Sequence, residues 1–96
     1  MATHSEVIQA IGREQWEALQ SSGLPLMVTN ELLSIWLEGW PERFHALVSC
    51  GALLPMLKGM GTSLRKARDL AGDPNMTHIS LSEKLAISGL PLVLFG

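Results

Sequence analysis

The densest run of apolar residues lies in segment 30–40, with the sequence NELLSIWLEGW. Placed on a helix, four of its residues form one stripe at spacing i, i+3, i+4 and i+7: Leu33, Trp36, Leu37 and Trp40. Neighbouring apolar residues widen this stripe to a second side of the helix. A helix with so broad an apolar face must be covered by several other elements. The pattern therefore predicts an all-α domain built around a central helix.

A first helix is predicted from Thr3 to Ser21, because Thr3 and Glu6 stand at the spacing of a capping box. Its inner face is marked by apolar residues: Val7, Ile8, Ile11, Ala18 and Leu19. Gly12 lies inside this helix, at a cost of about 1 kcal/mol relative to alanine. Gly23 can take the left-handed conformation that ends many helices, so we expect the helix to stop there.

The segments on either side of the central helix differ in kind. Residues 24–28 are predicted to form a short extended connector, after which Thr29 or Asn30 caps the central helix. Pro41 disfavours the α conformation in the residue before it and suits the first position of a helix. It is therefore expected to end the central helix and to begin the next one, over residues 41–54.

The second half of the chain is interrupted by proline and glycine. Pro55 is expected to break or kink the helix that precedes it. Helical spacing is clear over residues 63–71, whereas Gly59 and Gly61 disfavour a helix just before them. The cluster Gly-Asp-Pro-Asn at 72–75 predicts a turn.

A last helix is predicted over residues 81–87, because Ser80 and Glu83 repeat the capping-box spacing. The tail behind it repeats the Ser-Gly-Leu-Pro-Leu sequence of 22–26. Its residues 90–95 are therefore a second candidate for a short extended segment.

The composition favours one domain with an interface. The chain has 96 residues, and we expect residues 1–96 to form a single helical domain. This domain is predicted to be a small bundle of four to five helices, of which the middle ones are kinked or broken. The chain is 47% hydrophobic and only 17% charged, and its mean hydropathy is +0.24. This apolar balance predicts that part of the surface is buried against another chain, which favours a homodimer.

Charge and targeting features narrow the function classes. The formal net charge of −2 gives no bulk attraction to nucleic acid or to an anionic membrane. The first residues lack the pattern of a secretory signal, and no run of about 18 apolar residues is present. We expect a soluble cytoplasmic protein that does not interact with membranes.

The residues that most often carry chemistry are few and scattered. Cys50 is the single cysteine, which excludes an internal disulfide and suggests a small buried hydrophobe. His45 precedes it by five positions, about 140° away around a helix, so the two cannot form a local nucleophile–base pair. The three histidines have no second ligand at metal-binding spacing. We expect no enzymatic activity, metal or cofactor. A small enzyme or ligand binder that uses Cys50, or a pocket near the tryptophans, is the third alternative.

The run WLEGWPER resembles the WLxGWxE signature near the end of the ribosome modulation factor family, small bacterial proteins that bind and silence ribosomes. The matching residues are Trp36, Leu37, Gly39, Trp40 and Glu42. Members of that family are shorter and strongly basic, as rRNA binding requires. This chain is acidic and lacks the Cys-Pro-Tyr segment of the family, so no site is carried over.

Function is predicted from surfaces. We expect a non-enzymatic regulator that covers an apolar face of a protein partner, in the manner of an anti-activator, an adaptor or a chaperone, with a transcription regulator as a candidate partner. The predicted contact residues are Trp40, Glu42 and Arg43, together with Trp36, because an aromatic anchor with a polar rim is typical of binding surfaces. A position in the core is the alternative for both tryptophans, favoured for Trp36 and equally weighted for Trp40.

The alternative is a helical nucleic-acid-binding protein that uses the basic helix 63–71. This helix carries Arg65, Lys66 and Arg68, a concentration of positive charge that could contact nucleic acid or an acidic face of a protein partner. A solvated helix face is the commoner origin of such a cluster.

Overall fold

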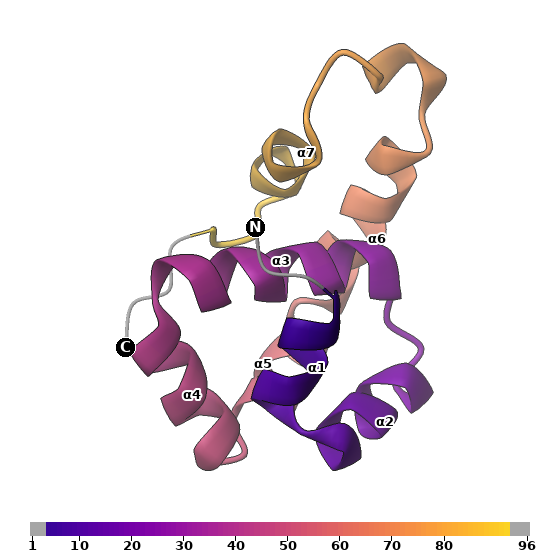
Figure 1. Ribbon diagram of the computed structural model, residues 1–96. Coiled ribbons are helices and arrows are strands. Elements are labelled where there is room, and N and C mark those ends of the chain that lie inside the picture. Colours follow the sequence, from indigo (N-terminus) through magenta and orange to yellow (C-terminus); the bar gives the residue numbers. More distant parts are fainter. Residues whose placement is uncertain (1–3, 93–96) are drawn as a thin grey trace.

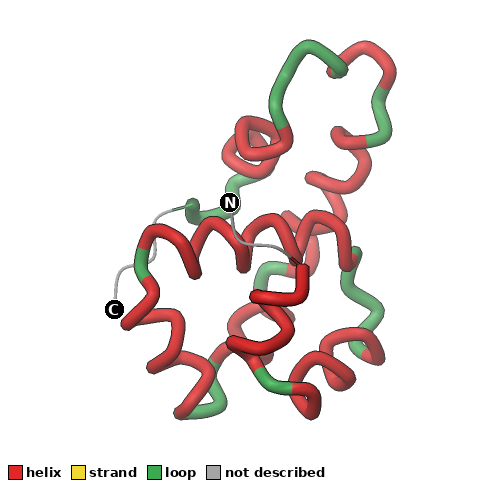
Figure 2. Tube along the Cα trace, in the orientation of Figure 1, coloured by secondary structure: helices red, strands yellow, loops and turns green. Residues whose placement is uncertain are grey.

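The computed structural model describes residues 4–92, which fold into seven α-helices and one 3₁₀ turn without any strand (Figure 1; Figure 2). The helices are α1 (His4–Ile11), α2 (Arg13–Ser21), α3 (Leu26–Gly39), α4 (Pro41–Ser49), α5 (Leu53–Gly59), α6 (Gly61–Ala71) and α7 (Leu81–Ile87), and the turn η1 is Pro74–Met76. The all-α class is confirmed. The helices outnumber the four or five expected because the first one is divided and α5 forms as a separate element.

Helix α3 is the centre of the fold, as its apolar face predicts. It packs against α1, α4, α6 and α7, and Figure 1 shows it crossing the middle of the molecule. The hydrophobic residues of α3 that have no exposed surface are Val28, Leu32, Leu33 and Trp36. Leu37 and Trp40, the other two members of the predicted stripe, are half-buried. The stripe is thus completely covered in the middle of α3 and only partly at its end.

The start of α3 differs from the prediction. Residues 24–28 are not an extended connector, because the helix already begins at Leu26. Pro25 supplies the extended residue before it, with φ −69° and ψ 107°. The carbonyl of Pro25 accepts the backbone N–H of Thr29 at 3.1 Å, and no side chain caps this helix. Thr29 and Asn30 therefore lie inside the first turns of α3, and neither is its cap.

Thr29 gives a first prediction. Its side chain has no exposed surface, and within residues 4–92 its Oγ1 has no hydrogen-bond partner. An unsatisfied buried hydroxyl costs roughly 1–3 kcal/mol. Thr29→Val replaces it with a methyl group of similar shape and is expected to raise the free energy of unfolding by about 1 kcal/mol in urea denaturation. Thr29→Ser, which keeps the hydroxyl and loses the methyl group, should lower it. A Thr29→Val variant less stable than the wild type would contradict this account.

The predicted first helix is divided at Gly12, which has φ +85° and ψ 149°. The chain changes direction there, so α1 and α2 are separate helices. Trp16 and Leu19 of α2 enter the core, whereas Ala18, expected on the inner face, is exposed. Thr3, one half of the predicted capping box, lies outside the described residues.

The helix predicted over residues 41–54 ends before Gly51 and not at Pro55. Gly51 has φ +74°. Its N–H donates to the carbonyl of Val48 at 3.2 Å, and the N–H of Ala52 donates to the carbonyl of Leu47 at 3.1 Å. This pair of bonds is a Schellman motif, which terminates α4. Pro55 instead lies in the first turn of α5, where its missing N–H costs little.

The start of α6 is earlier than predicted, whereas the turn behind α6 and the cap of α7 agree with the sequence pattern. Helix α6 already begins at Gly61, and the turn that follows it is held by Asp73, whose Oδ1 accepts the N–H of Asn75 at 2.9 Å. Helix α7 has the predicted bounds. Ser80 caps it by accepting the N–H of Glu83 at 3.3 Å.

The segment behind α7 packs back onto α3. Leu90 is 4% exposed, and the carbonyl of Pro91 accepts the indole N–H of Trp36 at 2.9 Å. Residues 90–92 are neither helix nor strand, and the rest of the predicted extended segment, 93–96, lies outside the described residues. The tail therefore covers the central helix of its own chain as far as Pro91.

Candidate functional site

A sharp corner joins α3 to α4, and a single residue, Trp40, lies between the two helices. Its N–H bonds to the carbonyl of Trp36 at 2.8 Å, and its own carbonyl accepts the N–H of Phe44 at 2.9 Å. Pro41 occupies the first position of α4. The backbone of Trp40 is thus tied to both helices, with φ −139° and ψ 62°.

A hollow of about 260 Å³ opens at this corner and is lined by Gly39, Trp40, Pro41, Glu42 and Arg43. Trp40 is half-buried, whereas Glu42 and Arg43 are exposed. Within the described residues, Glu42 and Arg43 take part in no ion pair. The structure therefore brings three of the four predicted contact residues together around one concave surface. We call this surface the α3–α4 corner.

The fourth predicted contact residue, Trp36, does not belong to that surface. It lies one turn before Trp40 and has no exposed surface, because α7 and the segment through Pro91 cover this part of α3. The sequence places Trp36 and Trp40 in one stripe, but only the end of the stripe is open. Trp36 is joined to the corner through its backbone carbonyl, which accepts the N–H of Trp40.

The basic residues of α6 reach the surface as a separate group. Arg65, Lys66 and Arg68 are all exposed. Arg68 approaches Asp69, with Nη2 and Oδ1 3.6 Å apart, and exposed pairs of this kind contribute at most about 1 kcal/mol. The structure leaves these cations accessible, and their binding to nucleic acid stays a prediction.

Cys50 is exposed, contrary to the expectation of a buried hydrophobe. It is the residue directly after α4, and its Sγ donates to the carbonyl of Leu47 at 3.6 Å. His45 is also exposed. Among residues 4–92, no three His, Cys, Asp or Glu side chains are grouped closely enough to hold a metal ion. No helix in the same range is both long and apolar enough to cross a membrane.

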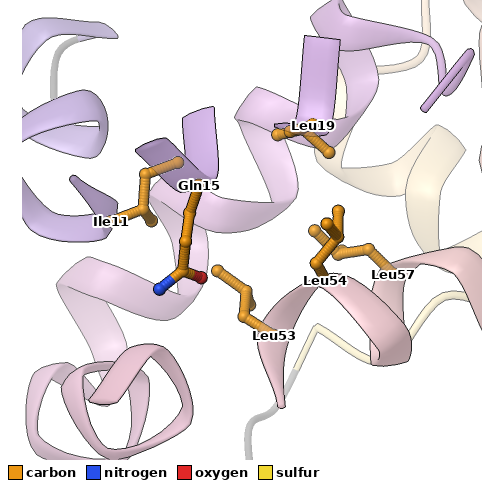
Figure 3. A pocket seen from close by; sticks show the side chains of 6 residues that line it. All are labelled: Ile11, Gln15, Leu19, Leu53, Leu54 and Leu57. Atoms are coloured by element: carbon orange, nitrogen blue, oxygen red, sulfur yellow. The ribbon is translucent and has the colours of Figure 1, made fainter. Parts of the chain in front are cut away.

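A small gap separates α2 from α5 and is lined mostly by leucines (Figure 3). Its volume is about 10 Å³, which at most suffices for one water molecule. Gln15 lies at its edge and donates from Nε2 to the carbonyl of Val48 at 3.1 Å, which ties α2 to α4. The gap is a packing feature and offers no room for a ligand.

A larger hollow, about 490 Å³, lies between α2, the start of α3 and α7. Its lining includes Trp16, Leu26, Met27, Asn30, Glu31 and Leu81. Met27 is 60% exposed, which makes it one of the two large hydrophobic side chains exposed in the described part of the chain. We call this hollow the α2–α3–α7 groove. The sequence indicates a pocket near the tryptophans only as an alternative and does not identify this lining, because its walls come from three separate segments and the pattern around Met27 predicts a connector.

Comparison with protein-family models, with curated proteins and with solved structures finds no match for this chain. The likeness of segment 36–42 to the ribosome modulation factor family stays confined to that segment. Function has to be inferred from the surfaces of the protein.

Proposed function

We propose that this chain is a non-enzymatic interaction protein that covers an apolar face of a protein partner through the α3–α4 corner. An anti-activator, an adaptor or a secretion-type chaperone would work in this way, and a transcription regulator is a candidate partner. The observation that carries the proposal is Trp40, half-buried in an open hollow that is also lined by two exposed residues of opposite charge, Glu42 and Arg43.

The corner has the features of a preorganised binding surface. The backbone hydrogen bonds on both sides of Trp40 fix the position from which its indole extends, so little conformational entropy is lost when a partner binds. The indole supplies apolar area. Glu42 and Arg43 can orient a partner that carries complementary charges.

The corner is tested by Trp40→Ala. The partner is first isolated by affinity capture on the wild-type protein, and its affinity for both proteins is then measured by calorimetry. We expect the variant to bind about thirtyfold more weakly, which corresponds to roughly 2 kcal/mol. The far-UV circular dichroism should be unchanged, since Trp40 is only half-buried.

Two further variants sharpen this test. Trp40→Phe keeps an aromatic anchor and should retain most of the affinity, and Arg43→Gln should change it by less than about tenfold because rim charges act mainly on the association rate. An unchanged affinity in Trp40→Ala would refute the proposal. Unfolding of that variant would place Trp40 in the core and count against the corner as well.

A homodimer is the second part of the proposal. It rests on the apolar composition and on the hydrophobic side chain of Ile87, which is 52% exposed. Light scattering at micromolar concentration is expected to give twice the monomer mass of 10.4 kDa. The monomer mass under those conditions would rule the dimer out.

A further inference from the structure

The charge in the lining of the α2–α3–α7 groove is negative. Its lining contains the carboxylate of Glu31 and neither lysine nor arginine. Glu31 is half-buried, and no cation within residues 4–92 forms an ion pair with it. A half-buried carboxylate gains more from a bound cation than a fully exposed one does. The groove therefore favours a ligand that brings a positive charge.

Asn30 adds a second acceptor beside Glu31. Asn30 is one of the lining residues, and its Oδ1 is buried and has no hydrogen-bond partner in the described part of the chain. A buried acceptor without a donor costs roughly 1–3 kcal/mol. The terminal torsion of an asparagine is soft, so rotation of the amide can present Oδ1 to the groove. A ligand with several N–H donors would satisfy it.

The remaining wall is apolar except for Gln20. Met27 extends into solvent, and Leu26 and Leu81 are half-buried next to it. A volume of about 490 Å³ lies within the range of roughly 300–1,000 Å³ that is common for ligand sites. Aliphatic groups that cover Met27 would remove apolar surface from water.

We propose that this groove binds a peptide segment of another protein in which an arginine is flanked by aliphatic residues. The planar guanidinium has five N–H donors, so it can bond to Glu31 and to the Oδ1 of Asn30 at once. Its methylene stem lies along Met27, and a neighbouring aliphatic side chain packs on Leu81. Lysine is less suitable because its ammonium is a compact charge that remains strongly hydrated.

This groove is distinct from the α3–α4 corner. Met27 and Trp40 are at opposite ends of α3, which places them roughly 20 Å apart by the helical rise. The two proposals are therefore independent, and a variant at one surface leaves the other intact.

The proposal is tested by nuclear magnetic resonance on the full chain labelled with ¹⁵N. The probe is the blocked peptide acetyl-Leu-Arg-Ala-Leu-amide, titrated to millimolar concentration. We expect shifts centred on Met27, Asn30 and Glu31, with the Trp40 signals unmoved. The same peptide with glutamine in place of arginine should bind about tenfold more weakly.

Two protein variants of equal charge complete the experiment. Glu31→Gln is expected to weaken the arginine peptide about tenfold. Glu17→Gln is the control, because Glu17 is outside the groove lining and is exposed beside Arg13 at 4.0 Å. Its spectrum and its affinity for the peptide should match the wild type.

Several results would overturn the proposal. These are the absence of shifts at millimolar peptide, equal binding of the arginine and glutamine peptides, and equal losses in Glu31→Gln and Glu17→Gln. Equal binding of agmatine, which has the guanidinium without the aliphatic neighbours, would reject a peptide as the ligand. Shifts of the groove that depend on protein concentration alone would assign it to a second copy of this chain.

Discussion

Trp36→Ala is expected to lower the free energy of unfolding by about 3–5 kcal/mol, which is much of the total stability of a domain this small. Trp36 has no exposed surface and lies in the most covered part of α3. Truncation removes an indole from this packing and leaves a cavity that the surrounding helices cannot fill. Urea denaturation followed by far-UV circular dichroism measures the loss.

Two other variants separate the causes of this effect. Trp36→Phe keeps most of the apolar volume and loses the hydrogen bond to Pro91, so a smaller loss of roughly 1–2 kcal/mol is expected. Leu37→Ala removes a neighbour that is only half-buried and should cost less than Trp36→Ala. If Leu37→Ala proves the more damaging change, the core is centred elsewhere on α3.

Gly12→Ala is expected to lower the free energy of unfolding by about 1–3 kcal/mol, although glycine is usually the less stable choice in helical regions. The cause is the backbone, because φ +85° with ψ 149° is nearly confined to glycine. A Cβ at Gly12 would meet no atom within 4 Å, so steric contact with neighbours is not the reason. Thermal and urea denaturation both report the change.

Gly59→Ala is the matched control for this prediction. Gly59 is helical, and a Cβ there also meets nothing within 4 Å. The alanine should therefore be neutral or stabilise the protein by up to about 1 kcal/mol. Equal effects of the two alanines would show that the corner between α1 and α2 is not fixed by Gly12.

The elements that could be predicted are those with local signals. The central helix follows from apolar spacing, and α7 follows from a serine cap that the structure shows at Ser80. The breaks at Gly12 and Gly51 are harder to predict, because helical spacing continues through both residues and glycine is tolerated inside helices. Pro55 is expected to break or kink a helix, but it lies in the first turn of α5, where the missing N–H of a proline costs little.

The same distinction applies to the surfaces. The α3–α4 corner is contiguous along the chain, so the grouping of Trp40, Glu42 and Arg43 follows from the sequence alone. The burial of Trp36 depends on a segment that folds back from far along the chain. The α2–α3–α7 groove has walls from three segments, and no single stretch of sequence carries its pattern.

The bond between Trp36 and Pro91 also bears on the order of folding. It joins residues 55 positions apart, and α7 with its following turn covers the same side of α3. During synthesis, α3 leaves the ribosome long before the segment that closes it. The side of α3 that α7 covers therefore stays exposed to solvent until α7 has been synthesised. Contacts of such long sequence separation also form slowly. This interval is when the chain is most open to aggregation and to capture by chaperones.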